Sequence, residues 1–213
     1  ISRCRAKGLD IYLSRTLIRD NRFELEKIQA IKLIRAIMEL AALRSITTAP
    51  DRLALDLEDL LSAGVVRALA AVAEHPDDKL KNICLETLAE LAVFDVRLLI
   101  KGGGLRSTLQ ALTEGATEFS PTLVQVFIYL VDMPGTRHHL RPGVDLEIAL
   151  SGFTETPVQK PITYDALLRC TASVVTVLLR SWAGLIYLCM DDKRAIKSLV
   201  QALRVNTLEV KSV

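Results

Sequence analysis

A short apolar segment centred on glycine recurs about every forty residues along this chain of 213 residues. Gly64 lies in the segment Leu60–Val66. Gly104 occupies the same place in Ile100–Leu105, 40 positions later, and Gly143 follows after a further 39 positions. A period of this length is typical of helical solenoids, in which each unit buries its apolar face only by stacking on its neighbours. We therefore expect stacked helical units with glycine turns at these three positions.

Helical patterns fill the stretches between these glycines. Apolar residues recur every three or four positions from Glu24 to Leu43, which predicts a long amphipathic helix with Lys27, Lys32 and Arg35 on its outer face. Thr48 and the following residues begin another helix. Further helices are predicted over 65–74, 78–93, 96–101, 105–112, 120–131, 136–140, from the glycine turn to about 150, and over 164–181. No segment has the alternation typical of a strand.

The order of a short, a middle and a long helix is typical of the armadillo repeat, whereas two equal helices would indicate the HEAT form. The predicted fold is therefore all-α, a right-handed armadillo/HEAT-type helical solenoid. The array divides into units at approximately 1–62, 63–94, 95–133, 134–182 and 183–213. The fourth unit contains an inserted surface loop at 152–163, because Pro157 and Pro161 interrupt the helical pattern.

The fifth unit is expected to be truncated, and the chain to be a fragment of a longer protein. Its short first helix holds Trp182 and Leu185–Leu188, and its middle helix spans 195–205. Asn206–Glu209 is a capping box for a last helix, in which Val205, Leu208 and Val210 would need a missing neighbour. We expect Trp182 to pack in the core.

Composition limits the class of function. The 27 basic and 25 acidic side chains give a net charge of +2, which argues against a general binder of nucleic acid or anionic membrane. Half of the residues are hydrophobic but only 5% are aromatic, which suits the packing of helix on helix. The most apolar stretch, 174–190, is interrupted by Arg180, Ser181 and Gly184, so it is too short to cross a bilayer.

The cysteines indicate a reducing compartment. Cys4, Cys84, Cys170 and Cys189 are at least 19 positions apart and show no spacing typical of a metal site. The last three lie among apolar residues, which predicts buried free thiols. Disulfides are rare where thiols are kept reduced, so we expect a protein of the cytosol or the nucleus.

No pattern indicates catalysis, a cofactor or a metal. His138 and His139 are adjacent, so on a helix they would point about 100° apart. Gly102–Gly104 lacks the Lys-Ser/Thr that follows a phosphate-binding loop. Asp77–Asp78 and Asp191–Asp192 precede predicted helices, where capping explains them. We expect no catalytic, cofactor-binding or metal-binding residues.

Basic side chains gather around two predicted turns, and two interpretations remain open. They are either solvated helix ends or parts of a ridge that binds an acidic partner surface. The candidate partner-binding residues are Arg137, His138, His139, Arg141, Lys193, Arg194 and Lys197.

Several stretches, in the same order along nearly the whole chain, resemble the Rictor (pianissimo) family, the defining subunit of TOR complex 2. They are Arg180–Cys189, Ser14–Leu17, Asp20–Asn21, Glu26–Arg35, Thr136–Arg137 and Val144–Glu147. The loop at 152–163 falls where family members vary, and several surface positions resemble a fungal-type member.

The resemblance implies a scaffold that is not an enzyme, the N-terminal armadillo region of a large helical protein. Such a protein binds TOR kinase and a stress-kinase-interacting adaptor, and the complex is insensitive to rapamycin and phosphorylates AGC kinases of the Akt type. The implied location is cytoplasmic, with peripheral attachment at the plasma membrane as part of the complex. The family offers no catalytic residues to carry over.

Three other classes of protein compete with this resemblance. An armadillo adaptor of another type, such as the GTPase-binding regulatory domain of a formin, would share the fold but lack the motif around Trp182. An armadillo transport receptor would need ladders of Asn and Trp, but the long helices offer Asn82 and no Trp before Trp182. An enzyme would need an arrangement of reactive residues that the sequence does not show.

Overall fold

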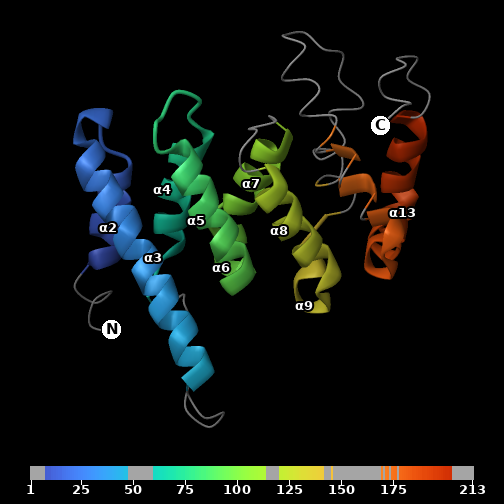
Figure 1. Cartoon of the computed structure of the whole chain (residues 1–213), viewed down its shortest axis with the longest axis horizontal. Coiled ribbons are helices and arrows are strands. Elements are labelled where there is room, and N and C mark those ends of the chain that lie inside the picture. Colours follow the sequence, from blue (N-terminus) through green and yellow to red (C-terminus); the bar gives the residue numbers. More distant parts are fainter. Residues whose placement is uncertain are drawn as a thin grey trace. The chain divides into compact units, whose positions relative to one another are not determined.

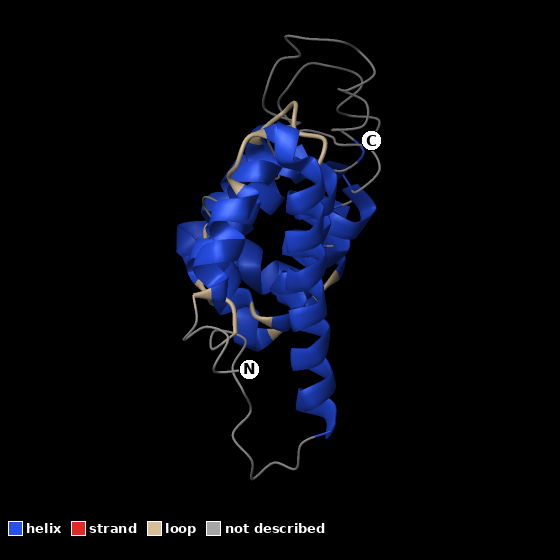
Figure 2. Cartoon of the chain, turned by 90° about the vertical axis from the view of Figure 1, so that its left-hand side faces the viewer, coloured by secondary structure: helices blue, strands red, loops and turns tan. Residues whose placement is uncertain are grey.

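The computed structural model describes residues 8–47, 60–113, 120–141, 145, 169, 171–172, 174–176 and 178–202. Within these ranges the regular structure is helical and no strand occurs (Figures 1 and 2). The all-α class is therefore confirmed for this part of the chain. The residues form two compact units, Ile1–Ser107 and Thr108–Val213, and each is described by itself. The solenoid arrangement and the division into five repeats stay predictions.

The first unit is a layered packing of helices around an aliphatic core. Its elements are α2 (Leu9–Leu17), the 3₁₀ turn η1 (Asn21–Phe23), α3 (Glu24–Thr47), α4 (Ala63–Glu74), α5 (Lys81–Phe94), α6 (Val96–Lys101) and the first turn of α7 (Gly104–Thr113). Helix α2 packs against α3 and α4, and α5 packs against α3, α4 and α6. The C-terminal part of α3 extends beyond its neighbours (Figure 1). Leu13, Leu17, Ile31, Leu69, Leu85 and Leu88 are among the buried core residues.

The three consecutive glycines Gly102–Gly104 follow the end of α6 and include the first residue of α7, and they are required for two different reasons. Gly103 has a φ of 82°, in the left-handed region that favours glycine, so it makes the turn. A Cβ on Gly102 would lie 2.4 Å from Val66, and one on Gly104 would lie 2.6 Å from Leu99. The outer two glycines therefore allow α7 and the turn to approach α4 and α6 closely.

The predicted glycine turns are only partly correct. Gly64 lies in the first turn of α4 and has no left-handed backbone, so the prediction of a turn at this residue is wrong. The chain bends before it, at 60–62. At the second position the left-handed residue is Gly103 and not Gly104. Gly143 lies outside the described residues.

The second unit is held by contacts between α8 and α13. The helices whose bounds the structure describes in this unit are the rest of α7, α8 (Ser120–Asp132), α9 (Pro134–Arg137) and α13 (Trp182–Ala202). The rings of Phe127 in α8 and Tyr187 in α13 meet edge to face, with centroids 6.3 Å apart. Ser181 precedes α13, where its Oγ accepts a hydrogen bond from the Gly184 backbone N–H at 2.9 Å.

Helix positions agree well with the sequence pattern, and most core predictions are confirmed. The predicted helix over 96–101 is α6, and the one over 120–131 is one residue shorter than α8. The helical period of the apolar residues in 78–93, 120–131 and 164–181 predicts a core that includes one side of each of these helices. The members of these apolar stripes that the structure finds buried are Leu85, Leu88, Leu91, Phe127, Leu130, Val174 and Leu178. The side chain of Val124 lies outside the description, as do the loop at 152–163, the helix predicted after Thr48 and the end of the chain after Ala202.

The start of the fifth predicted unit needs correction. The short helix and the separate middle helix are one helix, α13, although its backbone turns left-handed at Asp192 and Lys193, with φ of 54° and 60°. Trp182 was expected in the core, but 83% of it is exposed. Cys189 is also exposed, whereas Cys84 is buried as predicted, and both thiols are free. Cys4 and Cys170 lie outside the described residues.

Candidate interaction surfaces

The predicted basic residues of the second unit lie on two separate elements. Arg137 ends α9, and His138, His139 and Arg141 follow it in a turn. Lys193, Arg194 and Lys197 lie on α13, where the two lysines are exposed and the side chain of Arg194 is outside the description. Whether these positions form one partner-binding ridge stays a prediction.

Arg137 has a structural role within its own unit. Its Nε donates a hydrogen bond to the carbonyl oxygen of Val131 at 2.6 Å, and its Nη2 donates one to the carbonyl of Asp132 at 2.8 Å. The last carbonyls of a helix have no partner within the helix and carry partial negative charge. The guanidinium therefore caps the C-terminus of α8. The rings of His138 and His139 lie against each other in the following turn, with centroids 3.7 Å apart.

Arg141 positions a buried carboxylate. Its backbone N–H donates to Asp145 Oδ2 at 2.5 Å, and its Nη2 lies 3.9 Å from Asp145 Oδ1. Asp145 is only 3% exposed, and burial raises the pKa of its carboxyl although the Arg141 hydrogen bond and charge oppose the shift. Tyr187 is fully buried. This burial is the main cause that raises the pKa of its phenol, and the charge of Asp145 raises the pKa further. Its hydroxyl has no hydrogen-bond partner in the described structure.

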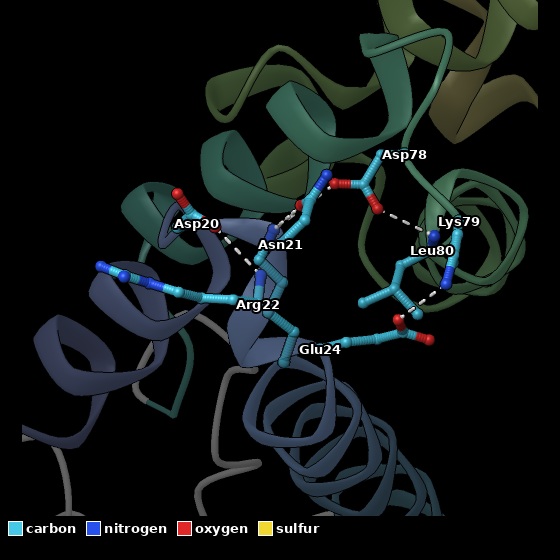
Figure 3. A network of polar contacts seen from close by, with 8 residues as sticks. Asp20, Asn21, Arg22, Glu24, Asp78, Lys79 and Leu80 are labelled. Atoms are coloured by element: carbon cyan, nitrogen blue, oxygen red, sulfur yellow. Dashed lines mark hydrogen bonds and ion pairs between the residues drawn. The ribbon is translucent and has the colours of Figure 1, made fainter.

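A polar cluster in the first unit brings Asn21 close to Asp78 and Leu80 (Figure 3), and Lys27 is at its centre. Lys27 Nζ donates to Asn21 Oδ1 at 2.7 Å and lies 3.4 Å from Asp78 Oδ2. Asp78 Oδ1 also accepts the backbone N–H of Leu80 at 2.9 Å, just before α5. The cluster thus joins the connection between α2 and α3 to the connection between α4 and α5.

Lys27 corrects one prediction, because the sequence pattern placed this residue on the outer face of its helix. Only 3% of the Lys27 side chain is exposed. A signal was present in the sequence: Lys27 is in helical register with Ile31, Ile34 and Met38, which are all buried. Asp78 Oδ1 accepts the Leu80 N–H in the turn before α5, but Leu80 is itself the N-cap of this helix and no side chain caps it, so the capping role expected for this aspartate is not confirmed.

Two shallow hollows flank the Lys27 cluster. The smaller, of about 120 Å³, is lined by residues that include Glu24, Lys27 and Lys79. The larger, of about 420 Å³, is lined by Lys27 together with Arg19 and His75 among others. Both acidic and basic residues line each hollow, and Lys27 already has an anionic and a neutral partner. The Lys27 cluster therefore holds together two loops of the same unit, the α2–α3 connection and the α4–α5 connection.

Cys84 is close enough to this cluster to respond to its charges. Burial raises the pKa of the thiol to about 12, the nearby Asp78 carboxylate adds to the shift, and Lys27 opposes it. A thiol with this pKa stays protonated at neutral pH, and the thiolate is the reactive form. Cys84 is therefore an inert core residue. In the described ranges no three His, Cys, Asp or Glu side chains gather as a metal site, and no helix is long and apolar enough to cross a membrane.

Comparison with known proteins gives a match over the whole chain. The family model described as "Rapamycin-insensitive companion of mTOR, N-term" matches residues 1–213. The chain is 28% identical to the target of rapamycin complex 2 subunit ste20 of Schizosaccharomyces pombe, over 98% of this chain and 16% of that protein. It is 29% identical to protein pianissimo A of Dictyostelium discoideum, over 93% of this chain and 17% of that protein.

The human relative, the rapamycin-insensitive companion of mTOR, is 24% identical over 95% of this chain and 12% of its own length. The chain thus spans less than a fifth of the length of the curated relatives it matches. Fungal proteins are among these relatives, in agreement with the fungal-type resemblance.

Proposed function

This chain belongs to the family of the rapamycin-insensitive companion of mTOR, N-terminal region, and we propose from that membership that it is part of a non-catalytic scaffold subunit of TOR complex 2. The observation that carries the proposal is the match of the family model to residues 1–213. Two relatives, from fission and budding yeast, are named as subunits of target of rapamycin complex 2. The scaffold would act by holding its partners at high local concentration.

The proposed architecture is a right-handed armadillo-type solenoid. The order of helix lengths supports this architecture. Helix α4 is a middle helix, α5 is long, α6 is short and α7 is again a middle helix, and the glycine turn precedes α7. Repeats of this kind present extended surfaces to other proteins. We propose that the present chain is one part of such a surface in a longer protein.

The proposed partners are TOR kinase and the stress-kinase-interacting adaptor, and the output is phosphorylation of AGC kinases. The exposed lysines Lys193 and Lys197 are suited to an acidic partner surface, because rim charges chiefly set association rate and specificity. Arg137 is less suited, since its guanidinium already binds the end of α8. We propose a cytoplasmic location, with peripheral attachment at the plasma membrane through the assembled complex.

The experiment is removal of residues 1–213 from the full-length protein in cells. We expect weaker association of TOR kinase with the adaptor and lower phosphorylation of AGC kinases, while TOR still phosphorylates substrates of its other complex. An intact and active complex would place the scaffold role elsewhere in the protein.

A milder change separates surface contact from misfolding. Lys193→Glu with Lys197→Glu reverses two exposed charges, and Lys32→Glu on α3 is the matched control. If the lysines contact an acidic partner, the double variant reduces recovery of the complex and the control does not. Recovery of Rho-type GTPases in place of TOR kinase would favour the formin-like class.

A further inference from the structure

The larger of the two hollows beside Lys27, of about 420 Å³, combines an apolar wall with polar groups. Leu17, Ile18, Ala71 and Val72, from the ends of α2 and α4, form the wall, and Ile18 and Ala71 are exposed. The borders of the undescribed ranges 1–7 and 48–59 are at the opposite ends of α2, α3 and α4, about 12–30 Å along these helices. A hollow of this volume is large enough for side chains of a partner.

Lys27 has one donor left for this hollow. Its Nζ donates to Asn21 Oδ1 at 2.7 Å and lies 3.4 Å from Asp78 Oδ2, which uses two of the three protons of the ammonium group. The described part of the first unit supplies no third acceptor. Only 3% of the side chain is exposed, and an unsatisfied buried donor is costly. An acceptor on a ligand would therefore be bound favourably.

Arg19 presents a second cation at the same hollow, in a fixed position. Its Nη1 donates to Glu26 Oε2 at 2.5 Å, and its guanidinium carbon lies 3.9 Å from the centroid of the Phe23 ring. A guanidinium has five N–H donors, and the contact with Glu26 uses only part of them. Because the ion pair and the ring already hold the group, little side-chain entropy is lost when it binds a ligand.

The two acidic residues of the hollow are already engaged with donors of the protein. Both carboxylate oxygens of Asp78 accept a hydrogen bond, one from the Leu80 backbone N–H and one from Lys27. Asp20 Oδ1 accepts the backbone N–H of Arg22. The groups that remain for a ligand are therefore mainly hydrogen-bond donors.

A carboxylate matches these donors. The lining offers it Arg19, Lys27, the Asn21 amide and the His75 ring. Arg19 and His75 also follow the C-termini of α2 and α4, where a basic side chain offsets the partial negative charge of the helix end. A doubly charged phosphate would be repelled more strongly than a carboxylate by the two aspartates of the same hollow.

We propose that this hollow binds the carboxylate of an Asp or Glu side chain in an acidic segment of a partner protein. An apolar neighbour of that residue lies against Ile18 and Ala71. Arg35 gives a precedent in the same unit, because Glu86 and Glu90 both bind its guanidinium. The inference does not depend on the TOR partnership.

Site-specific photocrosslinking identifies the occupant directly. The full-length protein with p-benzoylphenylalanine in place of Ala71 is purified with the proteins that assemble with it and irradiated, and the linked residues are identified by mass spectrometry. Arg67 is the control position, because it is exposed one turn earlier on α4 and does not line the hollow. We expect crosslinks from position 71, and not from position 67, to a segment of another protein with Asp or Glu within about three residues.

A charge variant tests the chemistry of recognition. His75→Glu adds a negative charge at the rim and should lower the yield of the position 71 crosslink at least about tenfold, because like charges across an interface oppose binding. Gln29→Glu adds the same charge on the exposed surface of α3, outside the hollow, and should leave the yield unchanged.

Four results would overturn the proposal. They are crosslinks confined to the same polypeptide or absent, a linked segment without acidic residues, equal yields with and without His75→Glu, and loss of the crosslink after phosphatase treatment, which would assign the hollow to a phosphoryl group. An acidic segment linked from a protein other than TOR kinase or the adaptor would support this inference and count only against the proposed function.

Discussion

Lys27 and Asp78 are 51 positions apart in the sequence, yet Lys27 Nζ lies 3.4 Å from Asp78 Oδ2 and both side chains are more than nine-tenths buried. Removing one charge of such a pair leaves the other buried without compensation, which costs about 3–5 kcal/mol. We expect Lys27→Met to lower the free energy of unfolding by about this amount, measured by urea denaturation. Lys27→Met with Asp78→Asn should recover most of the loss.

Lys79 and Glu24 give the matched exposed pair, since Lys79 Nζ lies 3.4 Å from Glu24 Oε2 in solvent. Lys79→Met should change the free energy of unfolding by less than about 1 kcal/mol. Equal losses of unfolding free energy for Lys27→Met and Lys79→Met would show that burial gives the Lys27–Asp78 ion pair no special contribution to stability.

Leu88 tests the core of the first unit. It is fully buried in α5 and would lie 2.9 Å from a Cβ on Gly104, so it fills the space beneath the glycine turn. Leu88→Ala should cost about 2–5 kcal/mol through lost burial and the cavity that remains. Leu25→Ala is the control, because 78% of Leu25 is exposed. A loss below about half a kcal/mol for Leu88→Ala would mean that the site collapses freely or that α5 is misplaced.

Asp145 predicts a dependence of stability on pH. Burial raises the pKa of this carboxyl above its ordinary value of 3.8, so the folded protein binds the proton more tightly than the unfolded chain does. The contribution of Asp145 to stability therefore falls as pH rises from about 3.8 through its folded-state pKa. Asp145→Asn should become more stable relative to wild type across this window and keep a constant difference above it.

The control for this pH series is Asp132→Asn, which changes an exposed carboxylate in the same unit. Chemical denaturation at several pH values gives both curves. If the stability of Asp145→Asn relative to wild type instead falls as pH rises, the Arg141 contacts outweigh the effect of burial on the Asp145 carboxyl.

At Tyr187 we predict a substitution that does not lower the free energy of unfolding. Its buried hydroxyl has no hydrogen-bond partner in the described structure, and leaving such a group unsatisfied carries a desolvation cost. Tyr187→Phe keeps the edge-to-face contact with Phe127 and should leave the free energy of unfolding unchanged or raised by about 1 kcal/mol. Tyr187→Leu removes the ring and should be destabilising. A clear loss for Tyr187→Phe would reveal a partner for the hydroxyl.

The sequence pattern predicted the helices well where local signals agreed. Helix α6 begins after Asp95, whose Oδ1 accepts the Leu98 backbone N–H at 3.0 Å, and it ends at the glycine triplet. A cap, a periodic stretch and a glycine stop all point to the same boundaries there. Gly64 lacked this agreement, because a glycine also fits the first turn of a helix.

Burial was harder to predict because it depends on contacts distant in sequence. Leu25, Leu33 and Leu40 are among the apolar residues of the periodic stretch from Glu24 to Leu43, yet all three are exposed, whereas Lys27 on the same helix is buried. Trp182 was assigned to the core on its apolar neighbours, but the packed side of α13 is the opposite one. For Lys27 the deciding partner, Asp78, lies 51 positions away in the sequence.

The central proposal is that this chain is part of a scaffold subunit that holds TOR kinase and its adaptor together. Its most direct test is crosslinking mass spectrometry of the purified, assembled complex with a lysine-reactive reagent. We predict crosslinks from exposed lysines of this region, such as Lys193 and Lys197, to TOR kinase or the stress-kinase-interacting adaptor. Crosslinks confined to other parts of the same polypeptide, in an active and intact complex, would contradict the claim.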